Sequence, residues 1–223
     1  MSIPKTIYQT YKTNKLPVLT RWHIMRMKKR NPSYEYRFYD DSMVDLFIKD
    51  EFEPEIFDLF KRINIGASKA DFFRYAILYK KGGIYLDIDS LFLTKLDEIV
   101  LPDDHAIISS GTHKQNYIQW ALFFEAGHPF LKKTIEIMLE NLRENKYPYD
   151  VHHMTGPTVY TEAIRDCIKE SSTVAYREMD VDYDKKLKFS YRMSKFFLYG
   201  ISRKKHWKTL SKTIPVLKPM ADS

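Results

Sequence analysis

The chain has little cysteine. Cys167 is the single cysteine among 223 residues, which excludes an intrachain disulfide framework and argues against a cysteine-based zinc site. We expect Cys167 to be a small buried residue in a helix. Long apolar runs are also missing, since no stretch approaches the ~20 residues that a membrane-spanning helix needs, and MSIPKTIYQT lacks a signal-peptide core. These absences predict a cytoplasmic protein.

Acidic residues are missing from one long stretch. Residues 185–212 hold ten Lys or Arg and no Asp or Glu, although the whole chain has 36 basic and 29 acidic residues. Aromatic residues alternate with these bases, a composition typical of a membrane-surface element. A nucleic-acid-binding face or a solvated basic face would look similar. Because the charge is confined to one end and no nucleic-acid motif is recognisable, we expect no nucleic-acid partner.

What the chain does contain indicates an α/β fold. Hydrophobic residues make up 44% of the sequence, enough for a real core. Apolar strand-like and helix-like segments alternate along it. Predicted strands lie around Ile7 and over residues 34–39, 84–88 and 106–110; predicted helices cover 16–30, 43–49, 52–65, 67–81, 130–143 and 159–168. We expect a main domain over 1–182 and a basic aromatic extension over 183–223 that completes the site, contacts a membrane, or both.

The chain is organised around residues 67–90, which read ASKADFFRYAILYKKGGIYLDIDS. The pattern predicts a buried helix with Ser68 as its cap and the Asp71 carboxylate reaching back to that cap. Gly82 and the glycine after it end the helix, because glycine accepts a left-handed conformation without steric penalty. A short apolar strand then leads to two aspartates.

Those aspartates, Asp87 and Asp89, suggest a metal site. Residues two apart on a strand point to the same side, so we expect the two carboxylates to project together. Paired carboxylates suit a hard divalent cation such as Mg²⁺ or Mn²⁺, which commonly keeps positions open for substrate phosphates.

The predicted helix carries one candidate ion pair. Asp71 and Arg74 are the only charged residues within 70–79, and a separation of three places them on one face. They can form a structural ion pair or a clamp for a polyhydroxylated ligand, and the residues alone leave both open.

The central segment, ASKADFFRYAILYKKGGIYLDID, resembles the signature of the DXD-containing sugar transferases of glycosyltransferase family 32, a group that includes initiating mannosyltransferases and bacterial capsule enzymes. Supporting matches are IPKTIYQTYKT, NPSYEYRFYDD, AGHPF and TGPTVYTEAI, which together cover most of residues 3–165 in order. The resemblance implies a GT-A fold, which is a Rossmann-like nucleotide-sugar-binding fold with a mixed central sheet flanked by helices. It also implies a nucleotide-sugar donor, a divalent metal and retention at the anomeric carbon.

The resemblance further implies roles for single residues. Asp71 and Arg74 would bind hydroxyls of the donor sugar, and Tyr85 would lie near the donor. Asp87 would contact ribose or sugar and help to hold the metal, while Asp89 would bind the metal directly. The residues that would approach the nucleotide are Tyr8, Gln9 and Thr10.

The C-terminal end departs from the family pattern. Members often finish with a histidine and a small-residue–tryptophan motif that completes the metal and phosphate site. Here the nearest match is Lys205-His206-Trp207, without the Gly-Ser-Trp that would follow. We take His206 as a candidate third metal ligand, with a basic residue on a membrane-facing surface as the alternative.

These inferences predict a retaining, metal-dependent hexosyltransferase of polysaccharide or glycoconjugate synthesis. We expect a UDP-sugar donor, with GDP-mannose as the alternative, and a saccharide or lipid-linked saccharide acceptor. Residues 185–212 would hold the protein peripherally on the anionic inner face of a membrane. A phosphatase of the haloacid dehalogenase type also uses Asp-x-Asp, but normally on the first strand, whereas the motif here begins at Asp87. A non-catalytic membrane-binding module is the remaining alternative.

Overall fold

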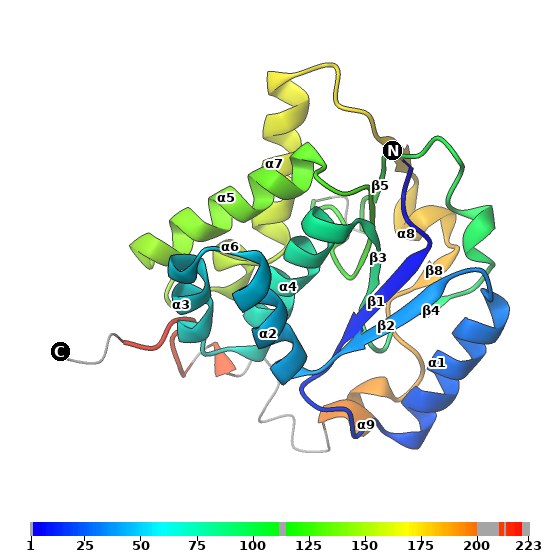
Figure 1. Ribbon diagram of the computed structural model, residues 1–223, viewed down its shortest axis with the longest axis horizontal. Coiled ribbons are helices and arrows are strands. Elements are labelled where there is room, and N and C mark those ends of the chain that lie inside the picture. The colour runs from blue at the N-terminus through cyan, green and yellow to red at the C-terminus, as the bar shows by residue number, and fades with distance from the viewer. Residues whose placement is uncertain (1, 112–114, 200–209, 212, 220–223) are drawn as a thin grey trace.

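The computed structural model describes residues 2–111, 115–199, 210–211 and 213–219. A six-stranded mixed sheet crosses it in the order β2-β1-β3-β6-β5-β7 (Figure 1). The strands are β1 (Thr6–Thr10), β2 (Glu35–Tyr39), β3 (Gly83–Leu86), β5 (Ala106–Ser109), β6 (Ala121–Phe124) and β7 (Arg177–Met179). Strand β1 is parallel to β2 and β3, and β6 is antiparallel to β3 and β5. The carboxyl ends of β1, β2 and β3 therefore meet at one edge.

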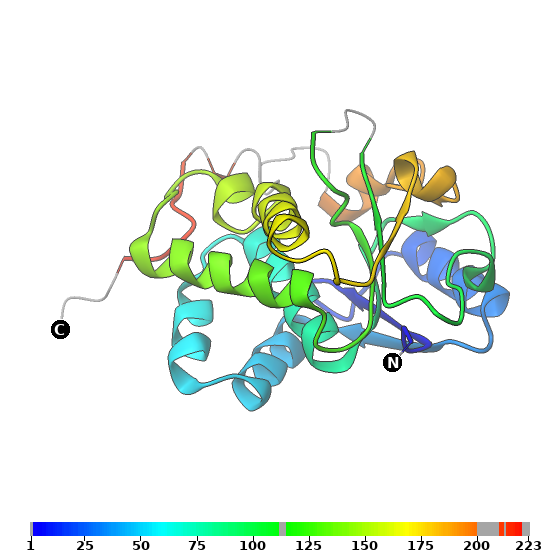
Figure 2. The same cartoon turned by 90° about the horizontal axis from the view of Figure 1, so that it is seen from above.

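Helices cover both faces of this sheet (Figure 2). On one face lie α2 (Asp41–Glu51), α3 (Pro54–Arg62), α4 (Gly66–Lys81), α5 (Pro129–Glu144), α6 (Val151–Met154) and α7 (Pro157–Glu170). The other face carries α1 (Val18–Arg30), the 3₁₀ turn η1 (Leu96–Glu98), α8 (Val181–Asp184), and β4 (Leu91–Phe92) paired with β8 (Leu187–Lys188). The last described helix is α9 (Ser194–Tyr199). The predicted mixed sheet with flanking helices is confirmed.

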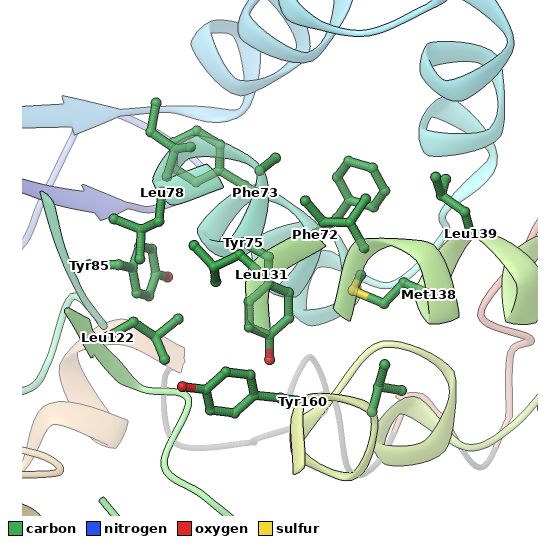
Figure 3. Packing of buried hydrophobic residues seen from close by; sticks show 14 of the residues in the cluster. Phe72, Phe73, Tyr75, Leu78, Tyr85, Leu122, Leu131, Met138, Leu139 and Tyr160 are labelled. Carbon is green, nitrogen blue, oxygen red and sulfur yellow. The ribbon is translucent and has the colours of Figure 1, made fainter. Parts of the chain in front are cut away.

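Side chains of successive strand residues pack into two separate hydrophobic cores, one on each face of the sheet, because side chains alternate along a strand. Tyr85 and Leu122 point into the core beneath α4, whereas Ile84 and Phe123 point into the core beneath α1. Figure 3 shows the first core, in which Tyr75 of α4 lies among side chains from α5 and α7. The predicted burial of this helix is confirmed, and Cys167 is likewise buried in a helix, α7.

The start of α4 differs from the sequence-based expectation. The helix begins at Gly66, after Ile65, and no side chain caps it. Ser68 therefore lies inside the first turn, and its buried Oγ has no hydrogen-bond partner among the described residues. The predicted capping box is wrong because the Asp71 carboxylate instead accepts hydrogen bonds from Thr155 and Gln119. These long-range hydrogen bonds occupy the Asp71 carboxylate, which the predicted capping box would have used.

Within the described residues, no helix has both the length and the apolar character needed to cross a bilayer.

The glycine break after α4 is confirmed and is sterically demanding. Gly82 has φ +64° and Gly83 has φ +109°, values that side-chain-bearing residues rarely adopt. A Cβ on Gly83 would lie 2.7 Å from the carbonyl oxygen of Thr6 on β1. Glycine therefore lets the chain turn directly from α4 into a strand that lies against β1.

We predict that Gly83→Ala lowers the free energy of unfolding by at least about 2 kcal/mol, because it combines backbone strain with a clash against β1. Gly66→Ala is the matched control, since a Cβ there meets no atom within 4 Å. It should change stability by less than about 1 kcal/mol, in the stabilising direction. Urea unfolding measures both, and equal stability of the two variants would contradict the packing described for β3.

Candidate active site

A cleft of about 990 Å³ opens at the sheet edge where β1 and β3 end. Segments that are distant in sequence meet along its walls. The predicted site residues among its lining are Thr10, Asp71, Arg74, Tyr85, Asp87 and Asp89. The structure therefore brings six of the nine predicted site residues into one cavity. Ligands of open α/β sheets bind at this position, beyond the carboxyl ends of the strands.

The two aspartates lie on a turn and not on the strand. Strand β3 ends at Leu86. The Asp87 N–H then donates to the carbonyl oxygen of Trp120 at 2.8 Å, and the Ser90 N–H donates to that of Asp87 at 2.9 Å. The prediction that strand pleating aligns Asp87 with Asp89 is therefore wrong. Both still line the cleft.

A buried guanidinium joins α4 to this turn. Arg74 Nη2 lies 3.2 Å from Asp71 Oδ1 and 3.3 Å from Asp87 Oδ1. Its Nη1 donates to the carbonyl oxygen of Gln119 at 2.8 Å. The guanidinium also lies over the ring of Tyr85, 4.9 Å from the centroid, and the Tyr85 hydroxyl donates to Asp87 Oδ1 at 3.0 Å. The predicted pairing of Asp71 with Arg74 is confirmed, and Asp87 belongs to the same network.

Asp71 is held by two further side chains. Thr155, just before α7, donates its hydroxyl to Oδ2 at 3.0 Å, and Gln119 Nε2 donates to Oδ1 at 3.1 Å. The Gln119 amide oxygen in turn accepts from the hydroxyl of Tyr75. Sequence reasoning assigned no role to Gln119 or Thr155. Two signals were available: Gln119 is a polar residue within the apolar run NYIQWALFFE, and Thr155 stands beside the Gly-Pro start of a helix.

The network places one cation between two carboxylates. Burial raises the pKa of Asp71, while Arg74, Thr155 and Gln119 act in the opposite direction. Burial also raises the pKa of Asp87 against the effect of Arg74. For Arg74 itself burial acts to lower the pKa, but the neighbouring carboxylates and phenols more than compensate and raise it. The arginine therefore stays charged, whereas burial favours the neutral form of both carboxyl groups.

The three predicted nucleotide contacts have different surroundings. Tyr8 is buried in the core beneath α4, with its ring 6.3 Å from that of Tyr39. Gln9 Nε2 donates to the carbonyl oxygen of Asp87 at 3.1 Å, so this buried side chain supports the turn. Thr10 lines the cleft, and its hydroxyl donates to the carbonyl oxygen of Tyr39 at 2.9 Å. Tyr8 and Gln9 are not among the residues that line the cavity.

The residues present fit a hard cation in part. The described residues contain no group of three or more His, Cys, Asp or Glu that would bind a metal without help. Magnesium-like ions are usually bound through one or two carboxylates together with substrate phosphates and water. Asp87 and Asp89, both lining the cleft, fit that pattern. His206, the predicted third ligand, lies outside the described residues.

The central residues lie within a recognised sequence region. Residues 17–106 match the family model described as the glycosyltransferase sugar-binding region containing a DXD motif. The chain therefore carries the sugar-binding region of the DXD-containing sugar transferases. The matched region includes the whole of α4, β3 and the Asp87–Asp89 turn.

Two of the curated relatives that match are fungal proteins. Mannosyl phosphorylinositol ceramide synthase CSH1 of Saccharomyces cerevisiae is 31% identical over 211 residues, covering 93% of this chain and 53% of the relative. The initiation-specific alpha-1,6-mannosyltransferase of Candida albicans is 24% identical over 72% of this chain and 52% of the relative. The chain thus spans about half the length of these curated relatives.

The solved structure of PaToxG Glycosyltransferase superposes with a TM-score of 0.58 at 19% identity, covering 78% of this chain and 72% of that one. With the mixed sheet already described, this likeness confirms the predicted GT-A fold.

We predict that Arg74→Lys lowers the free energy of unfolding by at least about 2 kcal/mol, because an ammonium cannot reproduce the planar fork that joins Asp71, Asp87 and Gln119. Arg37→Lys is the control, since the Arg37–Glu35 pair is half exposed on both sides. That variant should lose less than about 0.5 kcal/mol. Chemical denaturation tests the pair, and an Arg74→Lys protein as stable as Arg37→Lys would show that the network is not structural.

Proposed function

We propose that the chain transfers a hexose from a nucleotide sugar to a hydroxyl of a saccharide or lipid-linked acceptor, with retention at the anomeric carbon and with Mn²⁺ or Mg²⁺. One observation carries the proposal: Arg74 joins the Asp71 carboxylate to the DXD turn inside a single cleft. Charged groups of both signs, fixed beside an apolar wall, suit a polyhydroxylated and phosphorylated ligand. The described part of 183–223 supports its role in completing the site, since Phe189, Leu198 and Leu210 also line the cleft.

A mannosyl donor comes first among the candidates. Several of the relatives that match are named as mannosyltransferases or as mannosyl phosphorylinositol ceramide synthases, and this favours GDP-mannose. The sequence-based preference for a UDP-sugar remains the competing proposal. The acceptor would be a hydroxyl of a saccharide or a hydroxyl on the polar head of a lipid.

Asp71 and Arg74 would fix the orientation of the donor sugar. A carboxylate accepts hydrogen bonds from sugar hydroxyls and a guanidinium donates them, so the two together recognise a diol. Because Thr155, Gln119 and Tyr85 already hold this pair, little reorganisation is needed when the donor binds. The network would therefore act as a preformed clamp at the reacting sugar.

Asp87 and Asp89 would hold the divalent ion. When bound, such an ion stabilises the negative charge on a departing nucleoside diphosphate. Asp71 and Asp87 each lie within an ion pair to Arg74, so neither is a free carboxylate nucleophile. We therefore propose that the acceptor hydroxyl attacks from the face that the diphosphate leaves, with Arg74 fixed beside the donor.

We predict that Asp89→Ala lowers sugar-nucleotide turnover by at least about 100-fold, since even the supports of a metal ligand contribute 10–100-fold. Asp58→Ala, on an exposed site of α3, is the control and should retain full turnover. Released nucleoside diphosphate is measured with added Mn²⁺, and chelation of the metal should reduce the wild type to the level of Asp89→Ala. Equal turnover in the two variants would refute the metal assignment.

A donor screen decides the nucleotide and the sugar. We expect hydrolysis of GDP-mannose to exceed that of UDP-glucose and UDP-galactose, and no release of phosphate from a simple phosphomonoester. Faster turnover of a UDP-sugar would favour the sequence-based preference. Phosphomonoester hydrolysis without sugar-nucleotide turnover would instead support the phosphatase alternative.

A further inference from the structure

Two segments of the chain are basic and free of acid. Residues 1–34 contain eight Lys or Arg and no Asp or Glu, and residues 185–212 contain ten and none. Together they hold 18 of the 36 basic residues and none of the 29 acidic ones. The rest of the chain is consequently acidic overall, so the charge is strongly polarised along the sequence.

The fold brings these two segments together. The Tyr191 ring stacks on His23 of α1 with centroids 4.4 Å apart, and its hydroxyl lies 2.6 Å from Thr20 Oγ1. The Tyr11 hydroxyl donates to the carbonyl oxygen of Leu198 in α9 at 2.7 Å. Figure 1 shows α9 beside the first turns of α1. The described parts of two segments that are more than 150 residues apart in the chain thus lie side by side.

The outer face of α1 carries an apolar stripe. Thr20 and Met27 are buried against the body of the protein. Val18, Trp22 and Met25 are spaced by four and three residues, which places them on one helix face, and they are 82%, 44% and 61% exposed.

Exposed bases accompany this stripe, among them Arg21, Lys29 and Arg26, whose guanidinium lies over the Trp22 ring at 5.4 Å.

The second segment adds further exposed apolar side chains. They are Phe189, Met193, Phe196 and Phe197. Of the 13 large hydrophobic residues that are exposed in the described part of the chain, seven lie in these two segments. We call the exposed side chains of residues 12–29, 185–194 and 196–197 the basic-aromatic surface.

This surface adjoins the candidate active site. Tyr11 and Lys12 before α1, and Phe189 and Leu198 around α9, also line the cleft. A flat partner such as a membrane, bound to the basic-aromatic surface, would therefore lie at the cleft entrance.

We infer that the basic-aromatic surface docks on an anionic lipid membrane. Bases without acids attract anionic headgroups, and exposed Trp, Phe, Met and Val side chains insert at the boundary between headgroups and acyl chains. A nucleic acid would use the bases and stack on the aromatic rings, but it gives no role to the Val18–Met25 stripe. The docking itself does not depend on the proposed function. Only the further idea, that docking presents a lipid-borne hydroxyl to the cleft, rests on the proposed function.

The test is co-sedimentation of the full chain with vesicles of phosphatidylcholine, with and without phosphatidylserine. We expect binding that requires phosphatidylserine and weakens as salt is added. The double variant Trp22→Ser/Met25→Ser should bind at least about tenfold more weakly, because it removes apolar area that would enter the bilayer. Arg21→Gln should bind about fivefold more weakly through loss of one charge at the surface.

Met43→Ser/Leu46→Ser is the matched control, since both residues are exposed apolar side chains on α2, outside the two segments. It should bind vesicles like the wild type. All variants should release nucleoside diphosphate from a soluble donor at the wild-type rate, so a failure of docking is distinguishable from a failure of the proposed reaction.

Three results would overturn the inference. One is equal vesicle binding by the Trp22/Met25 and Met43/Leu46 variants. Another is binding of a single-stranded oligonucleotide without binding of vesicles. The third is a vesicle-independent dimer that the Trp22/Met25 variant abolishes, because a second copy would then be the partner of this face.

Discussion

The guanidinium of Arg74 is buried between the carboxylates of Asp71 and Asp87, and the other side chains of the site are arranged around this ion pair. Desolvating such charges is expensive, so a buried pair is a weak source of stability. Its structural consequence is positional: it ties the middle of α4 to the turn after β3. Gln119 strengthens the tie, because its carbonyl accepts from Arg74 while its side chain donates to Asp71.

The covalent connection between these parts is equally constrained. Two glycines join the last turn of α4 to β3, and the second of them, the first residue of β3, lies against the backbone of β1. Helix and turn are thus linked at one end by the chain and at the other by the ion pair. Gln9, from β1, supports the turn from the opposite side through the carbonyl oxygen of Asp87. A donor clamp and a metal seat can keep a fixed separation in such an arrangement.

The sequence predicted what depends on local pattern. The buried character of α4, the break at Gly82 and the pairing of Asp71 with Arg74 follow from composition and helical spacing. It did not predict that β3 would end at Leu86, because nothing in LDID marks the point at which the ladder with β6 stops. It also missed Gln119 and Thr155, which lie 48 and 84 residues from Asp71. Contacts at that separation are set by how α7 and β6 are placed, which periodicity does not encode.

The central claim is that the Asp71–Arg74 pair binds the donor sugar and not the nucleotide. Calorimetric titration of Asp71→Asn with a nucleotide sugar and with the matching nucleoside diphosphate tests it most directly, since asparagine keeps the size of the side chain. We expect at least about tenfold weaker binding of the nucleotide sugar, the effect of one lost charged hydrogen bond, with unchanged binding of the diphosphate. Equal loss of affinity for both ligands, or no loss for either, would contradict it.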